Sequence, residues 1–164
     1  MMIFLDFTQF GPPEAKAAGV TEGLARGLHA ALEHWQARYK DRHFTFEAYS
    51  LYGYQPRTEK HEFRKAKRFK HRNPLVFTGR SREATKVFRT KLVAGGERGI
   101  KRAYGVHENL PQYFYMWRGG APHKAEELYR TIEPEEREFR AIVLAHVEQG
   151  LAGASKSVQR ERVA

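Results

Sequence analysis

The chain has 164 residues, 41% of them hydrophobic and 13% aromatic, and it carries a formal net charge of +10. This length is typical of one globular domain that buries a core without covalent staples. The absence of cysteine excludes disulfides and thiolate metal sites, and the sequence predicts neither a membrane span nor a signal peptide. The positive charge favours a polyanionic partner, although a solvated basic surface explains it as well.

Long helices are predicted near the two ends of the chain. After a weakly alternating strand at residues 2–10, a helix is predicted over residues 20–39, with Thr21 as its N-cap and an apolar stripe with spacings of three and four. The stripe consists of Leu24, Leu28, Leu32, Trp35 and Tyr39. The second helix is predicted over residues 134–151, with a stripe formed by Phe139, Ile142, Val143, Val147 and Leu151. The polar tail, residues 152–164, is expected to be flexible.

Three segments between these helices predict antiparallel strands. Residues 43–52 alternate, with Phe44, Phe46 and Ala48 expected on one face. Residues 87–106 alternate on both sides of a glycine-containing turn and predict a β-hairpin. Residues 112–118 are the most aromatic run and predict a further strand. We therefore expect a single α+β domain over residues 1–151, with an antiparallel sheet, a long N-terminal helix, a C-terminal helix and a basic inserted arm or loop.

The insertion at residues 54–73 holds most of the excess positive charge. Eight basic residues and two acids lie between Arg57 and Arg72. Because this segment has so few apolar side chains, we expect an exposed loop, a projecting arm or a helix docked by Phe63 and Phe69. Contact with phosphate groups and a merely solvated segment remain equal alternatives. The candidate interaction surface combines it with the basic hairpin and comprises Arg57, Lys60, Arg64, Lys65, Lys67, Arg68, Lys70, Arg72, Arg89, Lys91 and Arg102.

The sequence predicts no catalytic, cofactor-binding or metal-binding residues. Glu59 and His61 lie close in sequence without a spacing that pairs them, and the sequence has no phosphate-binding loop, nucleophile elbow or helical zinc motif. Scattered histidine, glutamate and lysine residues are compatible with a nuclease, but no spacing identifies one. We therefore expect no enzyme and no cofactor.

Residues 74–93 are interpreted as the joint between the basic segment and the hairpin. Thr78 is expected to cap a short helix through its hydroxyl group, and Gly79 to allow a tight turn. These two residues are the predicted structural joint.

The segment Pro-Leu-Val-Phe-Thr-Gly-Arg-Ser-Arg at residues 74–82 resembles the Pro-x-x-x-Thr-Gly-Arg-Leu-Arg signature of the tailed-bacteriophage virion morphogenesis proteins, which act at the neck and complete the tail. In that family a helix precedes the signature, and a hairpin, an aromatic strand and a final helix follow it. Here Pro122, His123 and Lys124 precede the final helix. Phe77 and Ser81 depart from the family pattern, as does the long basic segment.

The resemblance implies a non-enzymatic virion protein, made in the host cytoplasm, that forms a ring at the head–tail junction. The ring is expected to be hexameric by that resemblance and to bind connector or portal-side proteins and tail-tube proteins, with no membrane. Its basic arm would face an acidic neighbouring subunit or the phage DNA in the channel. The alternative is a basic nucleic-acid-binding protein that is not part of a virion.

Overall fold

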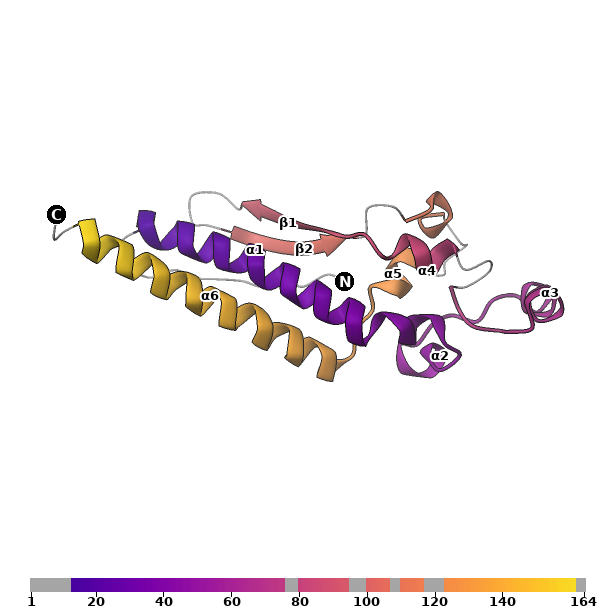
Figure 1. The fold of residues 1–164 in the computed structure, drawn as a ribbon. Coiled ribbons are helices and arrows are strands. Elements are labelled where there is room, and N and C mark those ends of the chain that lie inside the picture. The colour runs from indigo at the N-terminus through magenta and orange to yellow at the C-terminus, as the bar shows by residue number, and fades with distance from the viewer. Residues whose placement is uncertain (1–12, 76–79, 95–99, 107–109, 117–122, 162–164) are drawn as a thin grey trace. The chain divides into compact units, whose positions relative to one another are not determined.

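The computed structural model describes residues 13–75, 80–94, 100–106, 110–116 and 123–161 (Figure 1). The predicted strand at residues 2–10 and the predicted joint, Thr78 and Gly79, lie outside these ranges. The helices and strands in chain order are α1 (Pro13–Arg38), the 3-10 helix η1 (Lys40–Phe44), α2 (Ala48–Leu51), α3 (Glu59–Phe69), α4 (Arg80–Ala84), β1 (Arg89–Ala94), β2 (Ile100–Val106), the 3-10 helix η3 (Gln112–Phe114), α5 (Lys124–Leu128) and α6 (Glu133–Glu161). None of the described helices is long and apolar enough to cross a membrane.

The chain divides into two compact units. We call His34–Phe88 together with His107–Ile132 the pocket unit, because both pockets discussed below lie in it. The remainder, Met2–Glu33, Arg89–Val106 and Glu133–Ala164, is the hairpin unit. Helix α1 contributes residues to both units.

In the hairpin unit, α1 and α6 run antiparallel with their backbones in close approach (Figure 1). A β-carbon added at Gly23 would lie 2.7 Å from the carbonyl oxygen of His146, and one added at Gly27 would lie 2.9 Å from the Cα of Val143. The two glycines are four positions apart, so they share one face of α1. The predicted stripes are buried beside them, with Leu24, Leu28, Phe139 and Val143 almost fully covered. Small residues therefore bring the two helices together.

Both long helices extend beyond their predicted bounds. Helix α1 begins at Pro13, seven residues before the predicted start, so Thr21 lies inside the helix and is not its N-cap. Helix α6 continues to Glu161 and includes part of the predicted tail. Proline favours a first helical position because its missing N–H has no intrahelical acceptor there.

The β-hairpin prediction is confirmed. Strands β1 and β2 pair antiparallel, with Arg89 opposite Val106 and Lys91 opposite Tyr104. The register shifts between Val93 and Ala94.

The predicted α+β fold with an antiparallel sheet is wrong. The described part of the chain is predominantly helical, and its strands are confined to the β1–β2 pair. The two other predicted strands in the described ranges form helical turns instead.

The first of these, residues 43–52, folds as η1 and α2. Phe44, Ala48 and Tyr52 are buried at a spacing of four, whereas Phe46 is 62% exposed. A strand would have placed Phe44 and Phe46 on one face. The same residues satisfy alternation and a helical period, and burial selected the helical period.

The second, residues 112–118, contains the short helix η3. Phe114 is fully buried, while Tyr115 and Met116 are exposed. In the described part of this segment, which ends at Met116, one anchoring aromatic ring therefore replaces the predicted strand, and Tyr113 and Tyr115 remain at the surface.

Candidate interaction site

Helix α3 is the feature around which the candidate site is built. Glu59 and Glu62 lie in its first turn and Lys67 and Arg68 in its last, which is the arrangement that the helix dipole favours. The helix ends at Phe69, and its C-cap residue, Lys70, has a left-handed backbone at φ 59°. The basic segment contains a helix, but the predicted docking by Phe63 is wrong, because that ring is 68% exposed and Lys65 is the buried side chain of the helix.

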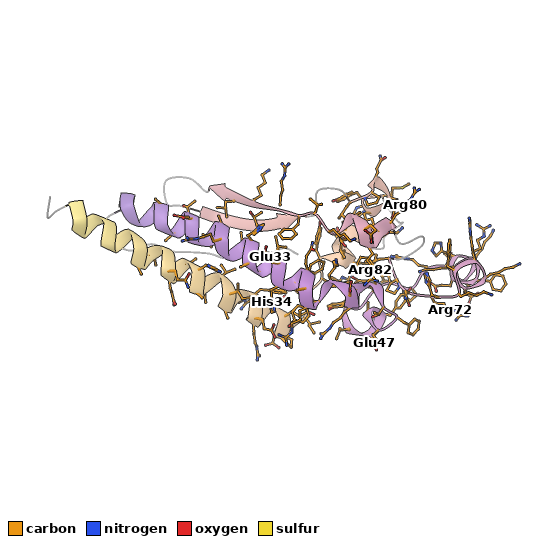
Figure 2. All side chains as sticks on the ribbon, in the orientation of Figure 1. Glu33, His34, Glu47, Arg72, Arg80 and Arg82 are labelled. Atoms are coloured by element: carbon orange, nitrogen blue, oxygen red, sulfur yellow. The ribbon has the colours of Figure 1, made fainter. Side chains whose placement is uncertain are left out.

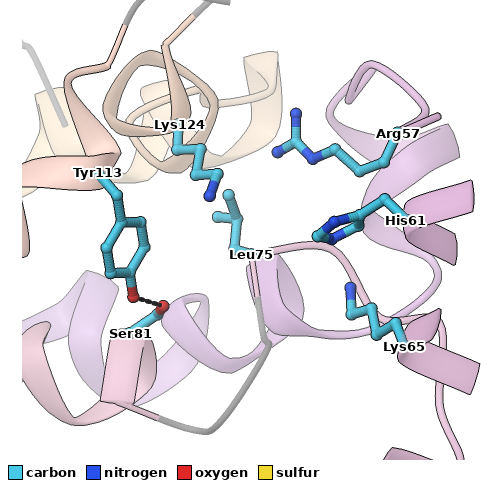
Figure 3. Close-up of a pocket in the computed structure, with 7 residues that line it drawn as sticks. All are labelled: Arg57, His61, Lys65, Leu75, Ser81, Tyr113 and Lys124. Carbon is cyan, nitrogen blue, oxygen red and sulfur yellow. Dashed lines mark hydrogen bonds between the residues drawn. The ribbon is translucent and has the colours of Figure 1, made fainter. Parts of the chain in front are cut away.

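One face of α3 borders a basic pocket of about 230 Å³ (Figure 3). Arg57, His61 and Lys65 follow one another at a spacing of four and form one wall of this pocket. Lys124, the first residue of α5, projects into the pocket from the opposite side (Figure 3). None of the described residues that line this pocket is acidic. We call it the basic pocket.

A buried ion pair holds Arg57 in the wall of the basic pocket. Its Nη2 donates to Oε2 of Glu127 at 2.6 Å, and the side chains are 10% and 0% exposed. The other carboxylate oxygen of Glu127 accepts the backbone N–H of Gln55 at 3.1 Å. The second guanidinium nitrogen, Nη1 of Arg57, is buried and has no hydrogen-bond partner among the described residues. A strong donor therefore remains unsatisfied in the wall.

The two lysines of the basic pocket are held without carboxylate partners in the described ranges. Lys65 is 2% exposed and donates to the backbone carbonyl of Asn73. Burial, followed by the coulombic effect of Arg57, lowers the pKa of Lys124. Burial likewise lowers the pKa of Lys65, against the opposing effect of Glu62. The ammonium groups are thus desolvated and lie near other positive charge.

A polar group and an aromatic ring complete the basic pocket. The hydroxyls of Ser81 on α4 and Tyr113 on η3 share a hydrogen bond (Figure 3). The Nζ of Lys124 lies 4.6 Å from the centroid of the Tyr113 ring, a cation–π contact. Burial, and then the charge of Lys65, lowers the pKa of His61, so its imidazole is mainly neutral near pH 7.

A second hollow of about 650 Å³ borders the same segment and shares Arg57 with the basic pocket, and we call it the aromatic groove. Its apolar wall is formed by Phe46, Tyr49, Tyr54, Pro56 and Phe63. Phe46 and Phe63 are 62% and 68% exposed. Exposed aromatic rings of this size in one concavity are typical of a surface that a partner covers.

Charged residues surround the aromatic groove. Tyr49 donates its hydroxyl hydrogen to Oε1 of Glu62 at 3.2 Å. Burial, reinforced by the charge of Glu62, raises the pKa of Tyr49 to about 12. Arg72 lines the groove from the segment that follows α3 (Figure 2).

The structure distributes the predicted interaction surface over both units. Helix α3 carries five of its members, Lys60, Arg64, Lys65, Lys67 and Arg68; Lys70 caps it, and Arg57 and Arg72 flank it. Only Arg57 and Lys65 line the basic pocket. Arg89 and Lys91 lie on β1 and Arg102 on β2, in the hairpin unit.

Sequence reasoning missed most residues of the two hollows. His61, Ser81, Tyr113 and Lys124 come from four different elements or turns, so no local pattern unites them. The one available signal was the spacing of four from Arg57 through His61 to Lys65. The strand prediction placed Phe46 on the same face as Phe44 and Ala48, whereas the structure buries those two residues and exposes Phe46.

The described residues contain no group of three or more histidine, aspartate or glutamate side chains that could hold a metal ion. Elsewhere in the pocket unit, Arg82 on α4 forms a bidentate ion pair with Asp41 at 3.0 and 2.6 Å (Figure 2).

No known protein family matches the chain, and neither does any curated protein or solved structure.

Proposed function

We propose that the protein is a structural component of a tailed-bacteriophage virion that forms a ring at the head–tail junction. It would bind other copies of itself in the ring and the connector or portal-side and tail-tube proteins on either side. This role requires no catalytic residue. The resemblance of residues 74–82 to the virion morphogenesis signature supports it, as does the order of a long helix, a hairpin and a second long helix.

The observation that carries the proposal is the aromatic groove. Phe46 and Phe63 expose most of their surface, although burying such a ring stabilises a protein by about 1.5–3 kcal/mol. Charged side chains, including Glu59 and Arg72, line the groove together with these aromatic rings. An apolar centre with a polar rim is the usual composition of a protein–protein interface. The groove therefore favours assembly with a protein partner.

A second candidate function is nucleic-acid binding outside a virion, favoured by the exposed basic side chains of α3. Lys60, Arg64, Lys67 and Arg68 are all at the surface, in contrast to Lys65. Such a cluster binds phosphodiester backbones by releasing counterions, so the affinity falls steeply with salt. It predicts binding of DNA or RNA by the isolated protein at low salt.

Mass photometry and negative-stain electron microscopy of the purified chain, alone and with its junction partners, test the assembly proposal. We expect closed rings for the wild type and loss of rings in Phe46→Ser and Phe63→Ser. A matched control, Leu144→Ser, removes another exposed apolar side chain in the hairpin unit and should leave the rings intact. The assembly proposal would be refuted if the chain stayed monomeric both alone and with its junction partners present.

Nucleic-acid binding is measured in parallel by fluorescence anisotropy over a salt series. Charge reversal at Lys60, Arg64, Lys67 and Arg68 should abolish binding if the second candidate is right. Rings that form without any nucleic-acid binding favour the junction role, whereas salt-sensitive binding by monomers favours the second candidate.

A further inference from the structure

The basic pocket holds more cationic side chains than the ion pairs among the described residues neutralise. Of its three permanent cations, only Arg57 has a carboxylate partner in the described part of the chain. Lys65 is satisfied by a carbonyl group and Lys124 contacts an aromatic face. Burying cations without counter-charge is costly because water is removed from them. Glu62 and Glu127 offset this cost for Lys65 and Lys124 only in part, so the described lining of the pocket is net positive in a partly desolvated place.

The donors of the pocket converge on one space. Arg57, His61 and Lys65 point into it from one wall and Lys124 from the other (Figure 3). Nη1 of Arg57 is buried in this wall without a partner among the described residues, on a side chain that is nine-tenths buried. Glu127 holds the guanidinium through its other terminal nitrogen, Nη2. The arrangement is therefore preorganised to donate to an anion.

We propose that the basic pocket binds a phosphate group. Four nitrogen-bearing side chains around a volume of about 230 Å³ suit a compact anion with three or four acceptor oxygens. A carboxylate has only two oxygens and would leave donors unsatisfied. Negative charge in the pocket would also favour the protonated forms of Lys65 and Lys124, which burial now disfavours. This proposal does not depend on the assembly role.

Binding of inorganic phosphate to the full chain, followed by ³¹P NMR line broadening and calorimetry at constant ionic strength, tests the site. We expect saturable binding with a dissociation constant of about 1 mM or below. Lys124→Gln should weaken it about tenfold, because a charged hydrogen bond is lost. Lys67→Gln removes the same charge from an exposed position of α3 and should leave the affinity unchanged.

Two further variants keep the test decisive. Lys124→Arg retains the charge and should retain binding, whereas Lys65→Met removes a cation from the opposite wall and should lose it. If Lys124→Gln does not fold, Lys65→Met is judged by the same criterion. Absence of saturable binding, equal weakening by Lys67→Gln, or acetate binding as tightly as phosphate would overturn the proposal.

Competition experiments identify the source of the phosphate. Displacement by a 5′-phosphorylated oligonucleotide alone indicates a terminal phosphate, and displacement by its unphosphorylated form as well indicates a backbone phosphate. Saturable phosphate binding that neither oligonucleotide displaces indicates a free phosphate or a small phosphate ester.

Discussion

Arg57 and Glu127 are seventy positions apart in sequence and form a buried ion pair, with Nη2 and Oε2 separated by 2.6 Å. The pair joins the segment that precedes α3 to α5. The carboxylate also accepts the backbone N–H of Gln55. The carboxylate of Glu127 thus holds the backbone of Gln55 and the guanidinium of Arg57 just before α3 begins, and it positions Arg57 in the wall of the basic pocket.

Glu127→Gln is expected to destabilise the protein by about 3 kcal/mol, because it leaves the buried Arg57 without counter-charge. The free energy of unfolding from urea denaturation measures this. Glu47→Gln is the control, since Glu47 is exposed (Figure 2) and should change stability by less than about 0.5 kcal/mol. Equal losses in both variants would show that the pair contributes nothing specific.

Gly23→Ala should destabilise the α1–α6 pair, whereas Gly153→Ala should stabilise it. The new methyl group at Gly23 meets the backbone of α6 at 2.7 Å, and overpacking of this kind costs about 1–3 kcal/mol. Around Gly153, in contrast, a β-carbon meets nothing within 4 Å, so alanine contributes its higher helix propensity, about 0.5–1 kcal/mol. Thermal unfolding compares the two. A stabilised Gly23→Ala protein would contradict the close approach of the helices.

The unfolding free energy should rise with pH just below the ordinary lysine pKa of 10.5 because of Lys65. Burial lowers its pKa below the ordinary value of 10.5, so between the two pKa values the unfolded chain binds more protons than the folded one. The positive charge of Arg57 acts in the same direction and Glu62 against it. In Lys65→Met the rise should be smaller. An unchanged pH slope of the unfolding free energy would show that Lys65 is not desolvated.

Phe63→Ser is expected to leave the unfolding free energy within about 0.5 kcal/mol of wild type, since the side chain is 68% exposed. Phe114→Ala, at a fully buried position of the same unit, should cost about 3–5 kcal/mol. Chemical denaturation of both variants separates a surface role from a core role. A large loss of stability in Phe63→Ser would place this ring in the core of the pocket unit.

Periodicity was sufficient to predict the long helices and the hairpin. Leu24, Leu28, Phe139 and Val143 repeat at helical spacing and are buried, and alternation about a glycine turn is found in β1 and β2. These patterns are local, so they can be read without knowing what packs against them. These patterns do not test the family resemblance or the interaction surface, and both stay predictions.

Packing decided the remainder. Residues 43–52 fit two periods, and only the burial of Phe44, Ala48 and Tyr52 beside an exposed Phe46 selects the helical one. The basic pocket required the distant segments of Arg57 and Lys124 to meet, which depends on the buried carboxylate of Glu127. Charge composition could indicate that α3 is basic, but which of its cations are solvated and which are desolvated around a cavity is a property of three-dimensional contacts alone.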